Sequence, residues 1–230
     1  MKIAGMQRLS QVDEHKIGLD LIKYSINHIA QFCSHLYFLQ IGDINEETLS
    51  HIESLGKPYK IVRTQVDYGR GWNFKNNESL DEMYKLIDDE QFDWVVYPDM
   101  DNLLPANMIE LLEQADEIEA ETVRLHIIEC FGGVDEIIEV KPGFPIGPHF
   151  IAVKHANDIT FVGSDGFCEA RKLDRKLVRH ETPYCARHMR YVGASQIENR
   201  KSMNYFQEYF LQDHATIKYL ENQKIDYYKR

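Results

Sequence analysis

Segments with the composition of β-strands alternate with segments of helical periodicity through the first hundred residues, and this alternation strongly constrains the fold. The expected strands cover residues 2–6, 36–41, 59–64 and 94–97, and the expected helices cover residues 13–32, 46–55 and 78–88. Polar loops are expected over 7–11 and 67–77. Because strands joined by helices usually run parallel in one sheet, we predict an α/β protein with a mainly parallel central sheet flanked by helices.

The second half of the chain is less regular. A helix is expected over 105–115, and strands over 122–129 and 136–140 are expected to form a hairpin around the Gly132–Gly133 turn. Further expected elements are a strand over 150–153, a short helix over 167–173, a last strand over 177–180, a loop over 183–191 and a C-terminal helix over 202–223. With no linker or repeat between these segments, residues 1–230 are expected to form one domain.

The charge balance narrows the classes of partner. The chain holds 26 Lys and Arg against 37 Asp and Glu, a formal net charge of -11. This acidity disfavours broad, charge-driven binding to nucleic acid. No apolar run approaches the roughly 20 residues that span a bilayer. The 4 cysteines are scattered without a CxxC pair, as free thiols in a reducing compartment would be. A cytoplasmic location is therefore expected.

Two carboxylates follow the expected strand 94–97 with one residue between them. Pro98 cannot donate to a neighbouring strand, so it is expected to mark the carboxyl end of this one. Asp99 and Asp101 would then lie where open α/β sheets bind their ligands. Two adjacent carboxylates repel each other unless a cation lies between them, and a hard divalent ion is the usual one. The spacing alone leaves a second interpretation open, a polar turn after a strand.

The order of these elements and motifs resembles a known family. Residues 76–83, which open a helix after an Asn-rich loop, lead into the strand and the Asp-x-Asp pair of 93–101. This cadence is similar to that of nucleotide-sugar glycosyltransferases of the GT-A fold, especially the family 2-like inverting enzymes, over about residues 1–190. Two features depart from the family pattern: Gly5-Met6-Gln7-Arg8 replaces its Pro-Thr-Tyr loop, and its aspartate-rich stretch is reduced to Gly42-Asp43.

The resemblance implies a division of the chain and a set of ligand-binding residues. Residues 1–102 would form a nucleotide-binding half, 103–200 an acceptor and catalytic half, and 201–230 C-terminal helices. Asp99, Asp101 and a late histidine would hold Mn²⁺ or Mg²⁺; His188 is the candidate, and His180 the alternative. The expected donor-binding residues are Gln7, Arg8, Asp43, Arg70, Asn73, Lys75, Asn77 and Asp99. Asp43 has an alternative role as a turn residue before a helix.

An inverting transfer also needs a general base near the acceptor hydroxyl. The resemblance favours Asp165, at the start of an expected helix, although a helix cap would also explain an aspartate there. Glu169 and Glu129 are the other candidates. The function implied is a metal-dependent glycosyltransferase that moves a sugar from a nucleotide-diphosphate sugar to a hydroxyl of a glycan, lipid-linked sugar, protein or modified nucleic-acid base, the charge disfavouring the last. A nucleotidyltransferase of similar fold and a non-catalytic sugar-nucleotide-binding module are the alternatives.

Overall fold

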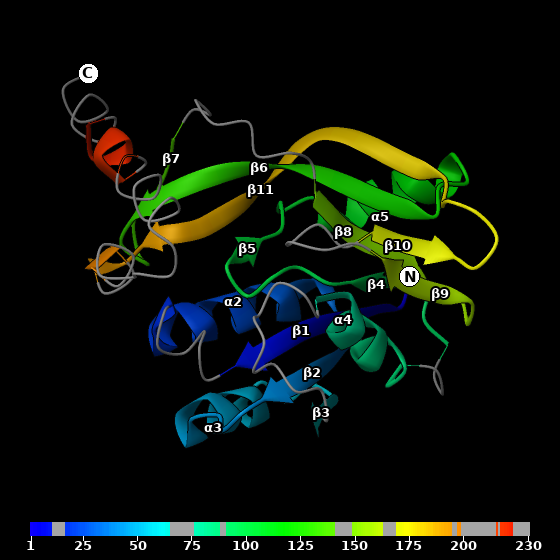
Figure 1. The fold of residues 1–230 in the computed structure, drawn as a ribbon, viewed down its shortest axis with the longest axis horizontal. Helices are drawn as coiled ribbons and strands as arrows, with labels where there is room; N and C mark the ends of the chain where they lie inside the picture. The colour runs from blue at the N-terminus through cyan, green and yellow to red at the C-terminus, as the bar shows by residue number, and fades with distance from the viewer. Residues whose placement is uncertain are drawn as a thin grey trace.

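The structure is a computed structural model that describes residues 1–10, 17–64, 76–87, 91–140, 149–162, 169–194, 197–198, 215 and 217–222. Its centre is a 9-stranded sheet in the order β3-β2-β1-β4-β8-β6-β11-β5, with β7 paired to β6. A separate 2-stranded sheet joins β10 to β9. The predicted α/β class, with helices around a central sheet, is confirmed (Figure 1).

The first half of the sheet is parallel. It contains β1 (Ile3–Ser10), β2 (His35–Ile41), β3 (Tyr59–Arg63) and β4 (Trp94–Val96), with β1 hydrogen-bonded to both β2 and β4. The helices between them are α2 (Leu19–Phe32), α3 (Glu46–Ser54) and α4 (Asn76–Tyr84). The alternating pattern predicted this half because each strand or helix buries one face at its own period.

The second half of the sheet is mixed. The strand β8 (His149–Lys154) runs antiparallel to both β4 and β6 (Thr122–Gly132). The long strand β11 (Arg179–Val192) lies between β6, to which it is parallel, and β5 (Asn102–Leu103), to which it is antiparallel. The predicted hairpin is confirmed as β6 and β7 (Ile137–Glu139). The remaining elements are α5 (Met108–Glu117), β9 (Ile159–Val162) and β10 (Glu169–Lys172).

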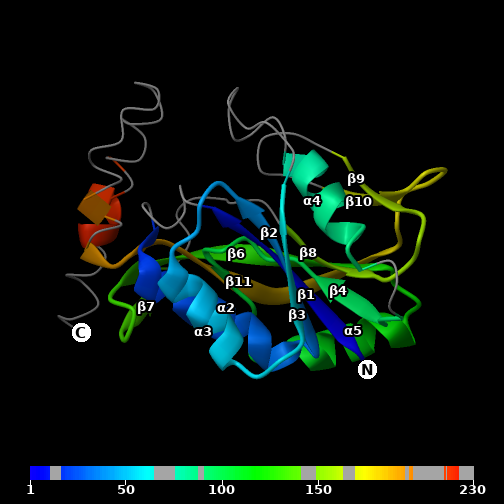
Figure 2. The same ribbon diagram turned by 90° about the horizontal axis from the view of Figure 1, so that it is seen from below.

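Apolar side chains form a core on each face of the sheet. On one face, Leu21, Ile22 and Ile26 of α2 join Leu111 of α5 and Trp94 of β4 in one cluster. On the other face, residues of α4 and β9 cover the sheet, with Leu80, Met83, Tyr84 and Phe161 in a second cluster. Figure 2 shows α2 and α3 on one side of the sheet and α4 on the other. The alternation along β1 therefore turns Gln7 toward α2 and Arg8 toward the opposite face.

Three predicted segments were wrong. Residues 7–10 continue β1 instead of forming a loop, because this central strand buries polar as well as apolar side chains; Gln7 and Ser10 are each 1% exposed. Residues 169–172 are strand β10 and not a helix, with Ala170 buried against the core. Residues 183–191 belong to β11 and not to a loop. Pro183 is accommodated there because the pairing with β6 shifts register between Glu181 and Cys185.

Two further predictions fall largely outside the described residues. The predicted C-terminal helix 202–223 is described at 215 and 217–222, which are helical. The predicted loop over 67–77 is described at 76 and 77, which already belong to α4. Within the described part of the chain, no helix is both long and apolar enough to cross a bilayer.

Candidate functional site

Polar side chains converge at the carboxyl edge of the parallel strands. Since β1, β2, β3 and β4 run in the same direction, the residues that end or follow them meet at one edge of the sheet. Arg8 lies near the end of β1, Asp43 follows β2, and Asp99 and Asp101 follow β4. Open α/β sheets bind ligands at this edge, so the topology brings together residues predicted to bind the donor and the metal.

His188 lies between two carboxylates. Its Nε2 is 3.0 Å from Oδ2 of Asp101, and its Nδ1 is 3.0 Å from Oε1 of Glu129. All three side chains are largely buried, with exposed fractions of 9% for His188, 18% for Asp101 and 11% for Glu129. Burial lowers the pKa of His188, but the charges of Asp101 and Glu129 outweigh it and raise the pKa to about 9. The three residues form one buried array of charge.

A second ion pair lies beside this array. The guanidinium Nη2 of Arg8 donates to Oδ1 of Asp99. The Arg8 side chain is 12% exposed and that of Asp99 is 39% exposed, so the carboxylate faces solvent more than its partner does. An arginine at the edge where ligands bind can also pair with phosphate oxygens. Arg8 and Asp99 therefore form the more open part of the site.

Sequence reasoning missed His149, the first residue of β8. Burial lowers the pKa of His149, and the charge of nearby Asp99 opposes that shift. The charges of His188 and Asp101 also act on it. The position follows from topology: β8 runs antiparallel to β4, so its first residue lies at the carboxyl end of β4, and the Tyr97 N–H donates to the Ile151 carbonyl at 2.8 Å. Once the pairing of β8 with β4 is known, the histidine at the start of β8 can be placed at this edge.

The other predicted donor-binding residues are more scattered. Gln7 is buried, and its Nε2 donates to Oγ of Ser25 in α2 at 3.2 Å. Asp43 is exposed and pairs with Arg63 at 3.1 Å. Asn77 lies in the first turn of α4, half-buried. Arg70, Asn73 and Lys75 lie outside the described residues.

Glu169 and His180 lie away from the array. Glu169 pairs with Arg171 at 3.0 Å and with Arg179 at 2.5 Å; burial raises its pKa, but these two arginines outweigh burial and lower it. His180 is paired in register with Val123, near the start of both β11 and β6. At ~3.3 Å per residue, the eight residue steps from His180 to His188 span about 26 Å of strand. The third candidate base, Asp165, lies outside the described residues.

The donor atoms at this edge suit a divalent cation that arrives with a ligand of its own. No three His, Cys, Asp or Glu side chains in the described ranges are arranged to hold a metal ion. Asp101 and His188 nevertheless place an oxygen and a nitrogen donor side by side, and Oε2 of Glu129 is buried without a hydrogen-bond partner among the described residues. Magnesium sites in nucleotide enzymes use one or two carboxylates and complete the shell with phosphate oxygens and water. The residues present fit such a site.

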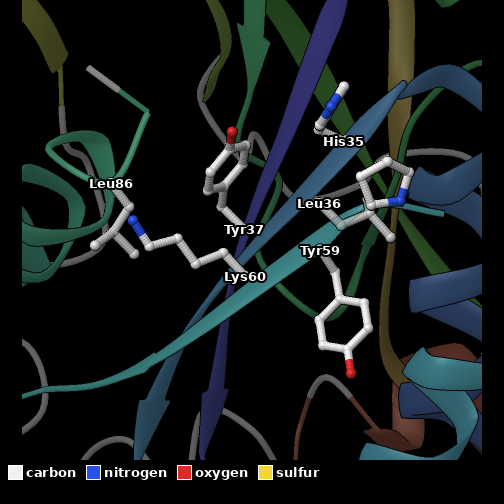
Figure 3. A pocket seen from close by; sticks show the side chains of 7 residues that line it. His35, Leu36, Tyr37, Tyr59, Lys60 and Leu86 are labelled. Atoms are coloured by element: carbon white, nitrogen blue, oxygen red, sulfur yellow. The ribbon is translucent and has the colours of Figure 1, made fainter. Parts of the chain in front are cut away.

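A separate hollow lies at the opposite ends of β2 and β3. It has a volume of about 290 Å³ and is lined by His35, Leu36, Tyr37, Pro58, Tyr59, Lys60 and Leu86 (Figure 3). His35 and Tyr59 are the first residues of β2 and β3, whereas Asp43 follows the last residue of β2. This hollow is therefore not part of the carboxyl edge.

Comparison with known proteins yields distant structural likeness alone. No family model matches this chain, and no curated protein matches it. TarS of S. aureus superposes with a TM-score of 0.49 at 12% identity, over 94% of this chain and 42% of TarS. The chain thus spans less than half the length of TarS. The 4-diphosphocytidyl-2C-methyl-D-erythritol synthase of Anaerococcus prevotii DSM 20548 superposes with a TM-score of 0.48 at 11% identity, over 94% of this chain and 98% of that enzyme. At such values, neither likeness says what this chain binds or catalyses.

Proposed function

We propose that this protein is a metal-dependent glycosyltransferase that moves a sugar from a nucleotide-diphosphate sugar to an acceptor hydroxyl, with inversion at the anomeric carbon. The observation that carries the proposal is the meeting of Asp99 and Asp101 with Arg8 and His188 at the carboxyl edge of β4. The order of motifs resembles that of GT-A glycosyltransferases, as the sequence alone indicates. The acidic pair and the arginine suit a ligand with a diphosphate group.

In the proposed reaction, the site must stabilise the diphosphate group as it leaves the sugar. A bound Mn²⁺ or Mg²⁺ would neutralise the negative charge that builds up on the diphosphate as the glycosidic bond breaks. Asp101 and His188 would hold this cation, with Asp99 contributing from the more open side. Arg8 would exchange its contact with Asp99 for one with a phosphate oxygen, since a guanidinium binds either group. Asp43, exposed after β2, would contact the ribose or base.

The proton of the acceptor hydroxyl requires a separate base. Glu129 already accepts a contact from His188, and Glu169 is held by two arginines, so neither carboxylate is free to approach an acceptor. We assign the base to Asp165, on the position that the family resemblance gives it. The carboxylate would take the hydroxyl proton while the oxygen attacks the anomeric carbon on the face opposite the diphosphate.

Replacing Asp101 provides the main test. Asp101→Ala removes a metal ligand, so the Mn²⁺-dependent release of nucleoside diphosphate should fall on the order of 10³-fold, about 4 kcal/mol of transition-state stabilisation. The measurement is nucleoside diphosphate release from a panel of sugar nucleotides, with and without Mn²⁺. Asp116→Ala is a control for the loss of a paired carboxylate elsewhere on the sheet: its side chain is 37% exposed, against 18% for Asp101, and it pairs with Lys154 near the start of β4.

The products also separate the alternatives. Release of pyrophosphate from a nucleoside triphosphate and a sugar phosphate would identify a nucleotidyltransferase, which could use the same carboxylates. Tight binding of sugar nucleotides without any turnover would favour a binding module. Turnover unchanged in Asp101→Ala would remove the metal role proposed for this edge.

A further inference from the structure

Glu129 is a buried carboxylate whose contact with His188 assigns it a role other than that of a base. We propose that Glu129 is a positioning residue: it fixes the imidazole of His188 with Nε2 turned toward Asp101 and thereby strengthens the binding of a divalent cation at this edge. The inference deepens the proposed function and rests on it. It concerns how the site is built, since Glu129 itself would not touch the cation.

Strand pairing places Glu129 next to His188, as a positioning role requires. His188 lies on β11, the strand between β6 and β5. It is paired in register with Glu129 on β6 and with Asn102 on β5, and the Met189 N–H donates to the Asp101 carbonyl at 2.6 Å. The ring of His188 is therefore held from both sides by neighbouring strands. A sheet fixes these positions more rigidly than a loop would.

The two ring nitrogens have different partners. Nδ1 faces Glu129 and Nε2 faces Asp101, each at 3.0 Å. A ring nitrogen that binds a metal carries no proton, and a neutral imidazole carries its proton on the other nitrogen. In the metal-free protein both nitrogens of the charged ring can donate, Nε2–H to Asp101. A bound cation would replace the Nε2 proton, and a carboxylate that accepts from Nδ1–H would then keep the Nε2 lone pair directed at the side where Asp101 lies. Metal-bound histidines commonly have such a carboxylate partner, which sets both the tautomer and the ring orientation.

The burial of Glu129 is costly and needs a compensating partner. The side chain is 11% exposed, and Ile127, Cys130 and Phe131 around it in β6 are buried. A carboxylate in such surroundings costs several kcal/mol unless it is paired. Its Oε1 contacts His188, while its Oε2 is buried without a hydrogen-bond partner among the described residues. The contact with His188 therefore offsets part of the cost of burying the charge of Glu129.

Binding of Mn²⁺ to the full chain distinguishes positioning from the alternatives. The probe is Mn²⁺ titrated by electron paramagnetic resonance in the presence of UDP, GDP, ADP or CDP, one at a time. Glu129→Ala should weaken Mn²⁺ binding about 10- to 100-fold, the usual effect of removing the partner of a metal-bound histidine. Glu129→Gln keeps an oxygen that can accept from Nδ1–H, so it should retain tighter binding than Glu129→Ala.

A matched control lies just before the same strand. Glu121 precedes β6 and its side chain is 16% exposed, close to the 11% of Glu129, but its partners are Lys172 and Arg175. Glu121→Ala should leave the affinity for Mn²⁺ within about twofold of the wild type while lowering the melting temperature. Rescue by glutamine at position 129, together with an unchanged affinity in the control, would support a positioning role.

The outcomes separate this inference from the proposed function. Wild-type affinity in Glu129→Ala, with binding lost in Asp101→Ala, would overturn the inference and leave the metal site standing. No specific Mn²⁺ binding by the wild type under any of these conditions would overturn both. Should Glu129→Ala not fold, Glu129→Leu, which fills a similar volume without an acceptor, decides: a loss of Mn²⁺ affinity of about tenfold or more supports the inference, and a smaller loss overturns it. A fall in kcat with unchanged Mn²⁺ affinity would instead identify Glu129 as a base.

Discussion

Two clusters of charge near opposite ends of β6 differ in how completely their carboxylates are paired. Glu121, just before β6, accepts from Arg175 at 2.5 and 2.7 Å and from the Val178 N–H at 3.1 Å, and it pairs with Lys172 at 2.8 Å. Glu129, farther along β6, has one partner on Oε1 and none among the described residues on Oε2.

The two clusters also differ in the charges that surround them. The cluster around Glu121 supplies its own cations. The hydrogen bond from Arg175 has the largest effect on the pKa of Glu121, and with Lys172 and the Val178 N–H it outweighs burial, which raises the pKa, so that the pKa is lowered to about 2. At the edge that holds Asp99, Asp101 and Glu129, the positive charges are those of Arg8, His188 and Arg190, whose charge acts on His188 and His149. The carboxylates there are less completely paired, since Asp99 is 39% exposed and Oε2 of Glu129 has no hydrogen-bond partner among the described residues. The first cluster stabilises the fold, and the second is the candidate site.

Among the variants that test the contrast between the two clusters, the largest effect is expected at the carboxyl edge. Arg8→Ala should lower kcat/KM for the sugar nucleotide about 100-fold, equal to ~2.7 kcal/mol, because it removes the guanidinium proposed to bind phosphate. Steady-state kinetics with the active donor measures this. Arg175→Ala, which breaks the ion pair of Arg175 with Glu121, is the control and should leave kcat/KM within about twofold. Equal losses in both variants would show that the two clusters do not differ in role.

A smaller effect is expected from Glu121 itself. Glu121→Ala leaves Arg175 and Lys172 without their carboxylate and should lower the free energy of unfolding by about 1–2 kcal/mol. The variant should keep its transferase activity per folded molecule. Urea unfolding followed by circular dichroism measures the stability. A loss of activity without a loss of stability would contradict the structural role assigned to this cluster.

The smallest expected effect concerns how the stabilisation of the fold by Glu121 depends on pH. The pKa of Glu121 falls from 4.5 to about 2 on folding, so its charge stabilises the folded state above pH 4.5 and this contribution is lost as pH falls toward 2. Glu121→Gln should therefore be less stable than the wild type at pH 7, by about 1 kcal/mol. The difference should shrink below pH 4.5 and vanish near pH 2. Urea midpoints at several pH values test this, and a constant difference would contradict it.

Local sequence patterns predicted the parallel half of the sheet well, because each strand and helix there buries apolar residues at its own period. The same reasoning failed where tertiary contacts override local composition. Gln7 and Ser10 suggested a loop, yet the central position of β1 buries them. Pro183 suggested a loop too, yet a shift in the β6–β11 register accommodates it within a strand.

Prediction of the site from the sequence has the same limits. The resemblance to a known family named Asp99, Asp101 and His188 together, and the structure places His188 against Asp101. Glu129 was named as a base because it ends an expected strand, and its contact with His188 depends on the register between two strands far apart in sequence. His149 was missed for a similar reason, since its place beside Asp99 follows from the antiparallel pairing of β8 with β4. Periodicity cannot report long-range register.

The position of β11 between β6 and β5 also governs the order in which the site can assemble during synthesis. His188 meets Glu129 across 59 residues of sequence and Asp101 across 87. Both carboxylates leave the ribosome well before the histidine that joins them. Until β11 is made and inserts, the nascent chain carries Asp101 and Glu129 without the cation that separates their charges. Pairings of such long range form slowly, so the edge proposed to bind a metal is completed at a late step of folding.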